Sequence, residues 1–103
     1  MSDRLLSQNQ LMAALNGSPE YLGTITSTAS SSTNSFTIPA GSILMLQPDA
    51  DVTLIGVSSA SGTVSAANGV DVGGGQRFYV TLRRDQAHVA CIGAANVKVF
   101  RLS

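Results

Sequence analysis

The chain has 103 residues and a mass of 10.6 kDa, which is the size of a single domain. Charged residues make up 12% of it, about half of the usual share of roughly 25%, and six basic side chains balance six acidic ones. A chain without net charge has no field of one sign to gather nucleic acid or an anionic membrane, so we expect neither as a partner.

The first segment, residues 3–15, has the pattern of a short amphipathic helix. Asn16 and Gly17 can end this helix, and Pro19 prevents its continuation. Four apolar side chains fall within an arc of about 120° at 100° per residue, namely Leu5, Leu11, Met12 and Leu15. A lone helix of this length is marginal in water. We therefore expect its apolar stripe to dock, either on the chain's own β body or on a neighbouring subunit.

From Tyr21 onward the apolar period changes to two, which is typical of β-strands. The predicted strands are 21–28, 35–38, 42–47, 51–57, 62–66, 76–82, 87–92 and 96–102, with 69–72 as a possible short addition. Residues 29–35 are predicted to be a loop, and Ile38–Gly41 a type I turn. Seven to nine short strands without a second helix favour an all-β fold, an antiparallel β-sandwich or jelly roll, with a small barrel as the alternative.

These patterns divide the chain into a helical arm, residues 1–19, and a β-sandwich domain, residues 20–103. Several predicted strands are apolar on both faces, whereas a strand with one wet face should alternate. The additional apolar residues include Ile55, Val57, Phe100 and Leu102. We expect some outer faces to be covered by the helix, by a partner, or by both, which favours an assembling subunit over a free monomer.

Charge is uneven along the chain. From residue 76 onward there are five basic side chains and one acidic side chain. Residues 1–75 contain one basic side chain and five acidic side chains. If the fold keeps these groups apart, the domain has a basic end and an acidic end; otherwise they are scattered, solvated charges. No stretch approaches the roughly 18 apolar residues of a membrane span.

The residues that carry chemistry are few. His88 is the single histidine and Cys91 the single cysteine, so no internal disulfide can form, which favours a reducing cytoplasm. Their odd separation places them on opposite faces of a strand, which excludes the Cys–His pair that nucleophilic catalysis needs. We interpret Cys91 as a core residue and His88 as a surface or interface residue. Together they supply too few ligands for zinc.

Other short motifs have structural interpretations. Asp49-Ala50-Asp51 lacks the further oxygen ligands of a calcium loop, and Gly73–Gly75 lacks the Lys-Ser/Thr ending of a phosphate loop. Arg83-Arg84-Asp85 is predicted to be a solvated hairpin tip. The aromatic residues are too few and dispersed for a nucleic-acid stacking platform; they are Tyr21, Phe36, Phe78, Tyr79 and Phe100. We expect no enzyme, with no catalytic residues, no metal site and no cofactor.

Several short runs between residues 20 and 102 carry a resemblance to a known class of protein. They are Phe36-Thr37-Ile38-Pro39-Ala40-Gly41, Leu44-Met45-Leu46-Gln47-Pro48-Asp49, Arg77-Phe78, Gln86-Ala87-His88-Val89-Ala90 and Asn96-Val97-Lys98-Val99-Phe100-Arg101. In this order they resemble small virion proteins of tailed bacteriophages, similar to capsid decoration (cement) subunits.

The resemblance implies a β-sandwich without catalytic residues that self-associates as a dimer or trimer on the capsid lattice. Its expected partner is the major capsid protein, and its expected place is the capsid exterior after synthesis in the host cytoplasm. Two other classes stay open: a head–tail or tail adaptor or fibre protein of the same phage, and a small carbohydrate-binding β-sandwich module. The location and copy number of the protein in purified particles would distinguish an adaptor from a decoration subunit. Binding to sugars would identify a carbohydrate-binding module.

Overall fold

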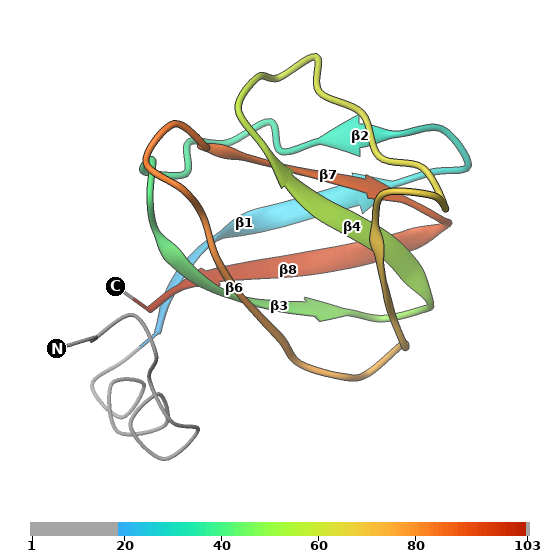
Figure 1. Cartoon of the computed structure of the whole chain (residues 1–103). Helices are drawn as coiled ribbons and strands as arrows, with labels where there is room; N and C mark the ends of the chain where they lie inside the picture. Colours follow the sequence, from blue (N-terminus) through green and yellow to red (C-terminus); the bar gives the residue numbers. More distant parts are fainter. Residues whose placement is uncertain (1–18, 103) are drawn as a thin grey trace, which may run out of the picture.

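A computed structural model of the chain describes residues 19–102 (Figure 1). Its regular secondary structure is entirely β, in eight strands: β1 (Glu20–Ser27), β2 (Ser32–Thr33), β3 (Ile43–Pro48), β4 (Val52–Val57), β5 (Val70–Val72), β6 (Phe78–Thr81), β7 (His88–Ile92) and β8 (Ala95–Arg101). The helix predicted for residues 3–15 lies outside the described residues. The described part contains no helix with the length and apolarity that a membrane span would need.

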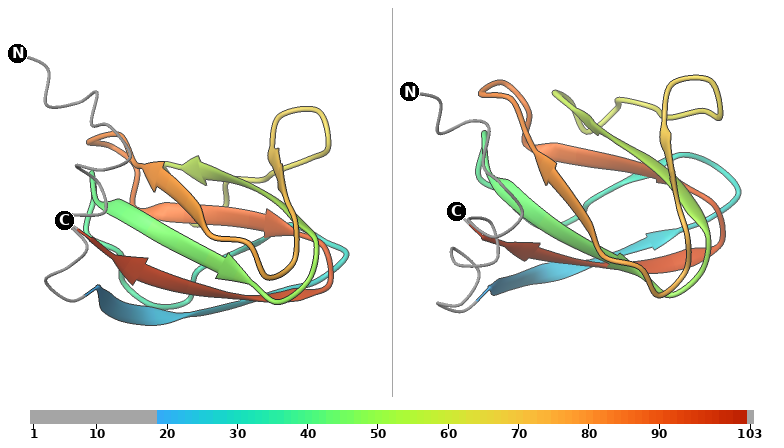
Figure 2. Two further views of the ribbon diagram at one scale, coloured as in Figure 1. Left: turned by 90° about the horizontal axis from the view of Figure 1, so that it is seen from below. Right: turned by 60° about the horizontal axis from the view of Figure 1, so that its bottom comes forward.

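The strands form two four-stranded antiparallel sheets. The first sheet has the order β1-β8-β3-β6 and the second sheet the order β2-β7-β4-β5. Strands pair as mirror images along the chain, β1 with β8, β2 with β7, β3 with β6 and β4 with β5. The chain is therefore an antiparallel ribbon folded back between β4 and β5. Two further pairings, β3 with β8 and β4 with β7, wrap this ribbon into facing sheets (Figure 2).

The core lies between the two sheets and follows the alternation of the strands. Residues of both sheets that point inward are almost fully buried, with exposed fractions of 0–1% for Leu44, Leu46, Leu54, Val89, Val97 and Val99. Side chains at neighbouring positions point outward because successive residues of a strand face opposite sides. The sequence thus indicated the inward faces of β4, β7 and β8, whereas the strand that becomes β3 is apolar on both faces and its pattern did not show which one is inward.

The outer face of the second sheet is covered by the chain itself. Residues 58–69, which connect β4 to β5, fold over it: Val64 donates its backbone N–H to Ser31 Oγ at 3.0 Å, and Thr33 Oγ1 donates to the carbonyl of Ala60 at 2.9 Å. Below this segment Ala90, on the outward side of β7, has no exposed surface, and Val64 is only 4% exposed. The prediction of a strand at 62–66 is wrong. Val64 belongs to this connection and is buried without strand pairing.

A second predicted strand, 35–38, is also wrong. The short β2 pairs with β7 only at Ser32 and Thr33. The pairing ends at Asn34, because its side chain accepts the N–H of Val89 at 2.9 Å. The same side chain donates a hydrogen bond to the carbonyl of Phe36 at 2.7 Å. Ile38 still reaches the core, at 2% exposed, from an irregular segment.

The predicted turn at Ile38–Gly41 is displaced by one residue. The observed turn is Pro39–Ser42, closed by the N–H of Ser42 on the carbonyl of Pro39 at 3.2 Å. Gly41 occupies its third position with φ of 76°, a left-handed conformation that glycine adopts without strain and that type II turns require. The turn leads directly into β3.

A bulge in β1 brings two residues into close contact with the segment before β3. The pairing register of β1 with β8 shifts between Tyr21 and Gly23, which leaves Leu22 as the extra residue of a bulge. A Cβ on Gly23 would lie 2.5 Å from Cδ1 of Phe36, and Phe36 packs against the core. The aromatic ring therefore rests directly on the glycine backbone.

We expect Gly23→Ala to lower the free energy of unfolding by about 1–3 kcal/mol, the usual cost of overpacking. Urea denaturation of the two proteins would measure the difference. Gly73→Ala is the matched control, because its Cβ would meet only the flexible end of Gln76, at 3.1 Å, and a surface change of this kind costs within about 0.5 kcal/mol. Equal stability of G23A and the parent protein would contradict the contact.

Candidate functional site

The outer face of the first sheet carries a continuous row of large side chains. Tyr21 in β1 pairs with Phe100 in β8, Phe100 pairs with Met45 in β3, and Met45 pairs with Tyr79 in β6. Because directly paired residues point to the same side of a sheet, these four side chains cross all four strands in one line. We call Tyr21, Phe100, Met45 and Tyr79 the outer row.

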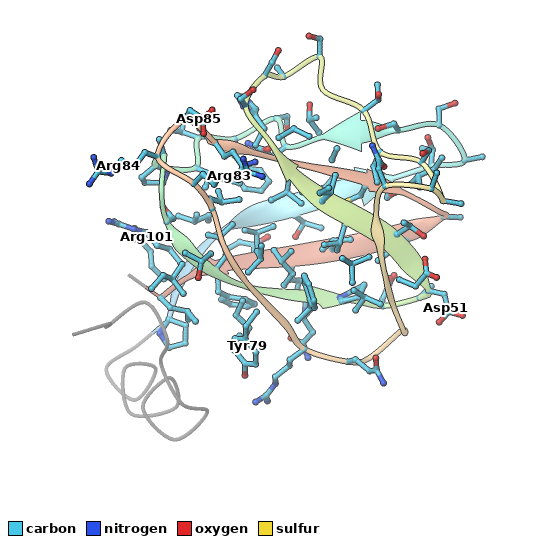
Figure 3. All side chains as sticks on the ribbon, in the orientation of Figure 1. Asp51, Tyr79, Arg83, Arg84, Asp85 and Arg101 are labelled. Atoms are coloured by element: carbon cyan, nitrogen blue, oxygen red, sulfur yellow. The ribbon has the colours of Figure 1, made fainter. Side chains whose placement is uncertain are left out.

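The outer row is apolar at its centre and more exposed at its β1 end. Leu44 and Leu46 point inward, so Met45 points outward, yet only 8% of Met45 is exposed. Tyr21, at the β1 end of the row, is 55% exposed. The rings of Tyr21 and Phe100 are tilted by 58° with centroids 5.5 Å apart, a separation within the range of favourable aromatic pairs. Figure 3 shows Tyr79 pointing away from the space between the sheets.

Different residues flank the two sides of the outer row. Toward the Arg101 end of β8 lie Ile43 and Leu102, joined by the N–H of Leu102 on the carbonyl of Ile43 at 2.8 Å. On the other side lie polar residues, where Lys98 pairs with both Gln47 and Thr24. The apolar half of this face is therefore the half beside the first described residues of the chain.

The prediction that the aromatic residues are dispersed is wrong for the residues of the outer row. Three of the five, Tyr21, Tyr79 and Phe100, come from different strands and meet on one face. Alternation within β6 and β8 could have indicated that Tyr79 and Phe100 point away from the core. Only the register between strands shows that they lie in line.

The charged residues are only partly separated. Arg83, Arg84 and Arg101 lie at one end of the sandwich and Asp51 at the other (Figure 3). Asp85 and Glu20 also lie at the basic end. Glu20 forms an ion pair with Arg101, with 3.8 Å between Oε1 and Nη1. At the other end Lys98 lines the same depression as Asp49, so basic and acidic side chains are mixed at both ends of the sandwich.

Residues 83–85 are not the tip of a hairpin between paired strands. They connect β6 in the first sheet to β7 in the second. The turn is closed by the N–H of Gln86 on the carbonyl of Arg83 at 2.9 Å, and Gln86 Nε2 donates to the carbonyl of Gly56 at 3.2 Å. Arg83, Arg84 and Asp85 are all exposed, so the expectation of a solvated turn is confirmed.

The aspartates interpreted as turn residues accept backbone N–H groups. Asp49 Oδ1 accepts the N–H of Asn96 at 2.8 Å, and Asp51 Oδ1 accepts the N–H of Gly74 at 2.9 Å. Gly74 lies so close to Ala50 that a Cβ would meet its Cα at 2.7 Å. Gly74 thus lets the segment before β6 pack closely on the turn between β3 and β4.

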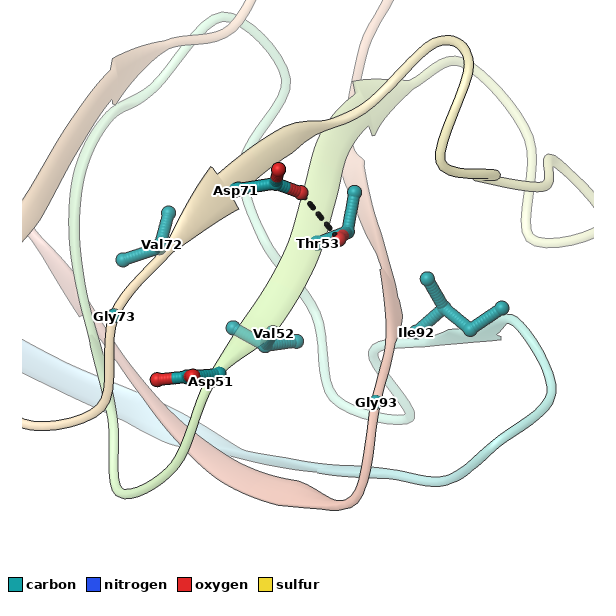
Figure 4. Close-up of a pocket in the computed structure, with 8 residues that line it drawn as sticks. All are labelled: Asp51, Val52, Thr53, Asp71, Val72, Gly73, Ile92 and Gly93. Atoms are coloured by element: carbon teal, nitrogen blue, oxygen red, sulfur yellow. Dashed lines mark hydrogen bonds between the residues drawn. The ribbon is translucent and has the colours of Figure 1, made fainter.

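An open depression of about 470 Å³ lies beside this turn (Figure 4). It is lined by Asp51, Val52, Thr53, Asp71, Val72, Gly73, Ile92 and Gly93. Asp71 Oδ1 accepts the hydroxyl of Thr53 at 2.7 Å. Across residues 19–102, His, Cys, Asp and Glu side chains nowhere gather in a group of three that could hold a metal ion.

His88 and Cys91 lie on opposite faces of β7, as predicted. Cys91 points into the core with no exposed surface, while His88 pairs with Val57 on the outward side. The Nδ1 atom of His88 is buried without a hydrogen-bond partner among the described residues. Burial raises the pKa of the Cys91 thiol from 9.0 to about 12, so the thiol stays protonated and a poor nucleophile.

The raised pKa predicts a loss of stability at high pH. In the unfolded chain the thiol ionises around its ordinary pKa of 9.0, whereas in the folded protein it ionises only around a pKa of about 12. The contribution of the buried thiol to the free energy of unfolding is therefore complete below pH 9 and falls as the pH rises between these two values. At pH 10 the loss should be about 1 kcal/mol. Urea unfolding at pH 8 and pH 10 would measure it.

The Cys91→Ala variant is the control for other groups that titrate in this range, and its free energy of unfolding should change less between the two pH values. In the folded parent protein at pH 8, Cys91 should be protected from a thiol reagent that modifies it in urea. Rapid modification of the folded protein would contradict the burial.

Comparisons of the chain with protein-family models, curated proteins and solved structures find no significant match.

Proposed function

We propose that this protein is a non-enzymatic structural subunit of a virion, which decorates the exterior of a phage capsid and binds the major capsid protein. The observation that carries the proposal is the strand topology. Two facing sheets of order β1-β8-β3-β6 and β2-β7-β4-β5, built from mirror-image pairs, fit a jelly roll. The jelly roll is a recurrent fold of viral capsid domains, and also of lectins and cupins.

The placement of the reactive side chains supports a structural role over catalysis. Cys91 is buried in the core, His88 points to the other face of its strand, and the carboxylates of Asp49 and Asp51 are held by backbone N–H groups. Acid–base or nucleophilic catalysis needs such groups within hydrogen-bond reach of each other. Here Cys91, Asp49 and Asp51 serve the fold, and His88 lies on the opposite face of β7 from Cys91.

A decoration subunit must bind a lattice more tightly than it binds single coat proteins, and avidity can provide this. One small contact gives a free energy near −8 kcal/mol at about micromolar affinity. A dimer or trimer that makes two or three such contacts gains about 10² to 10⁴ in effective affinity. The apolar surface of the first sheet supports this role, either directly or through the N-terminal arm that the sequence predicts.

A carbohydrate-binding module is the second candidate, and the outer row is the observation that favours it. Tyr21, Phe100 and Tyr79 lie in one line across the first sheet, with Met45 between the last two, and the jelly roll also occurs in lectins. Most polar groups that could bind sugar hydroxyls, such as Lys98 and Gln47, lie on one side of the row only. We therefore place this function second.

To test the proposal, purified protein is mixed with capsids that lack it and, separately, with coat monomers. We expect high-copy saturation of capsids, a higher rupture temperature and no comparable binding to monomers. Binding should persist at about 1 M salt, where the Debye length is about 3 Å, because apolar contacts dominate. The Arg83→Ser/Arg84→Ser variant is the matched control for contacts through the basic end, and it should also bind.

Three results would contradict the decoration role. Equal binding to monomers and shells would remove the argument from avidity. Saturation at a few copies per particle would favour a head–tail or tail adaptor. Binding to a sugar array without binding to capsids would favour the carbohydrate-binding module.

A further inference from the structure

We propose that residues 3–15 dock as a helix on the outer row of the same chain. The inference goes beyond the proposed function and does not rest on it, because it concerns the free protein. Its first support is a difference between the two sheets. Residues 58–69 cover the outer face of the second sheet, whereas Figure 2 shows none of the described segments over the outer face of the first.

The second support is the match in size and character. Strands are spaced by about 4.8 Å, so a row across four strands is about 14 Å long. A helix of 13 residues is about 20 Å long and spans this distance. Its stripe of Leu5, Leu11, Met12 and Leu15 supplies aliphatic side chains against the aromatic rings and Met45 of the row.

The third support is the place where the chain enters the sheet. Glu20 pairs with Arg101, and Tyr21, the next residue, is the first member of the outer row. The apolar neighbours Ile43 and Leu102 lie at this same end. Only Asn16–Pro19 separate the predicted helix from β1, and four extended residues reach about 13 Å. The helix can therefore lie over the row without straining the connection.

The short connection also decides between the chain's own helix and that of a second copy. A tether of this length keeps the helix at an effective concentration of millimolar order next to its own row. A second copy at micromolar concentration competes poorly against this. We therefore assign the row to the helix of the same chain.

The two tyrosines give a direct readout in the full chain. Tyr21 and Tyr79 are the only tyrosines, both belong to the outer row, and the chain has no tryptophan. Replacing Leu11 and Met12 together by Ser should expose the row and raise acrylamide quenching of tyrosine fluorescence at least twofold. Leu6→Ser is the matched control, because Leu6 lies on the opposite side of the helix, and quenching should not change.

Crosslinking identifies which chain supplies the helix. Gln8 lies on the same side of the helix as the apolar stripe and Gln10 on the opposite side at 100° per residue, and Thr81 is an exposed neighbour of Ile43 on the first sheet. A short bismaleimide should join the cysteines of Gln8→Cys/Thr81→Cys within one chain, about tenfold faster than in Gln10→Cys/Thr81→Cys. The buried Cys91 should not react.

Each alternative has its own signature in these measurements. Crosslinks formed only between chains would show that a second copy is the occupant and would overturn the inference. Equal rates for the Gln8 and Gln10 variants, or unchanged tyrosine quenching, would show that the helix does not dock on the row. None of these readouts requires a capsid, so a failure of capsid binding leaves them unaffected.

Discussion

The structure depends on the register of β8, which pairs with β1 on one side and with β3 on the other. These two pairings place Val97 and Val99 in the core without exposed surface. The same register places Phe100 between Tyr21 and Met45 on the outer face. The hydrophobic core and the outer row are thus two consequences of one set of backbone hydrogen bonds, since a shift by one residue would exchange the two faces of the strand.

The two sheets handle their outward apolar residues differently. On the second sheet, Ala90 lies beneath the long β4–β5 connection, and Val64 from that connection is buried with it. Val57, which the sequence presented as a candidate contact for a partner, lies against Gly62 of the same connection. Apolar outward residues on this sheet therefore reflect a third layer of the chain itself. On the first sheet the corresponding residues form the outer row, which no described segment covers and which we assign to the helix of residues 3–15.

The molecule is tied together by its turns as well as by its strands. Asp49 joins the end of β3 to the start of β8 through Asn96, and Asp51 joins β4 to the glycines before β6. Gln86 connects the β6–β7 turn to β4. Side chains that could have served a reactive site are used in this way to hold the ends of the sandwich, which supports the structural role that we propose.

The sequence by itself determined the all-β class of the described residues, the inward faces of β4, β7 and β8, and the separation of His88 from Cys91. Alternation with a period of two is a local property of a strand, so it can be recognised without knowing the partners of the strand. For the same reason it failed at 35–38 and 62–66, where the buried residues Ile38 and Val64 belong to irregular segments rather than to strands.

The outer row was decided only by the tertiary structure. Counting back from Ile25 by twos places Tyr21 inward; the bulge at Leu22 turns it outward, and the pairing of β8 with β3 brings it into line with Met45 and Tyr79. Bulges and registers are set by contacts between segments far apart in the chain, and these contacts do not exist until the ribbon has folded back on itself.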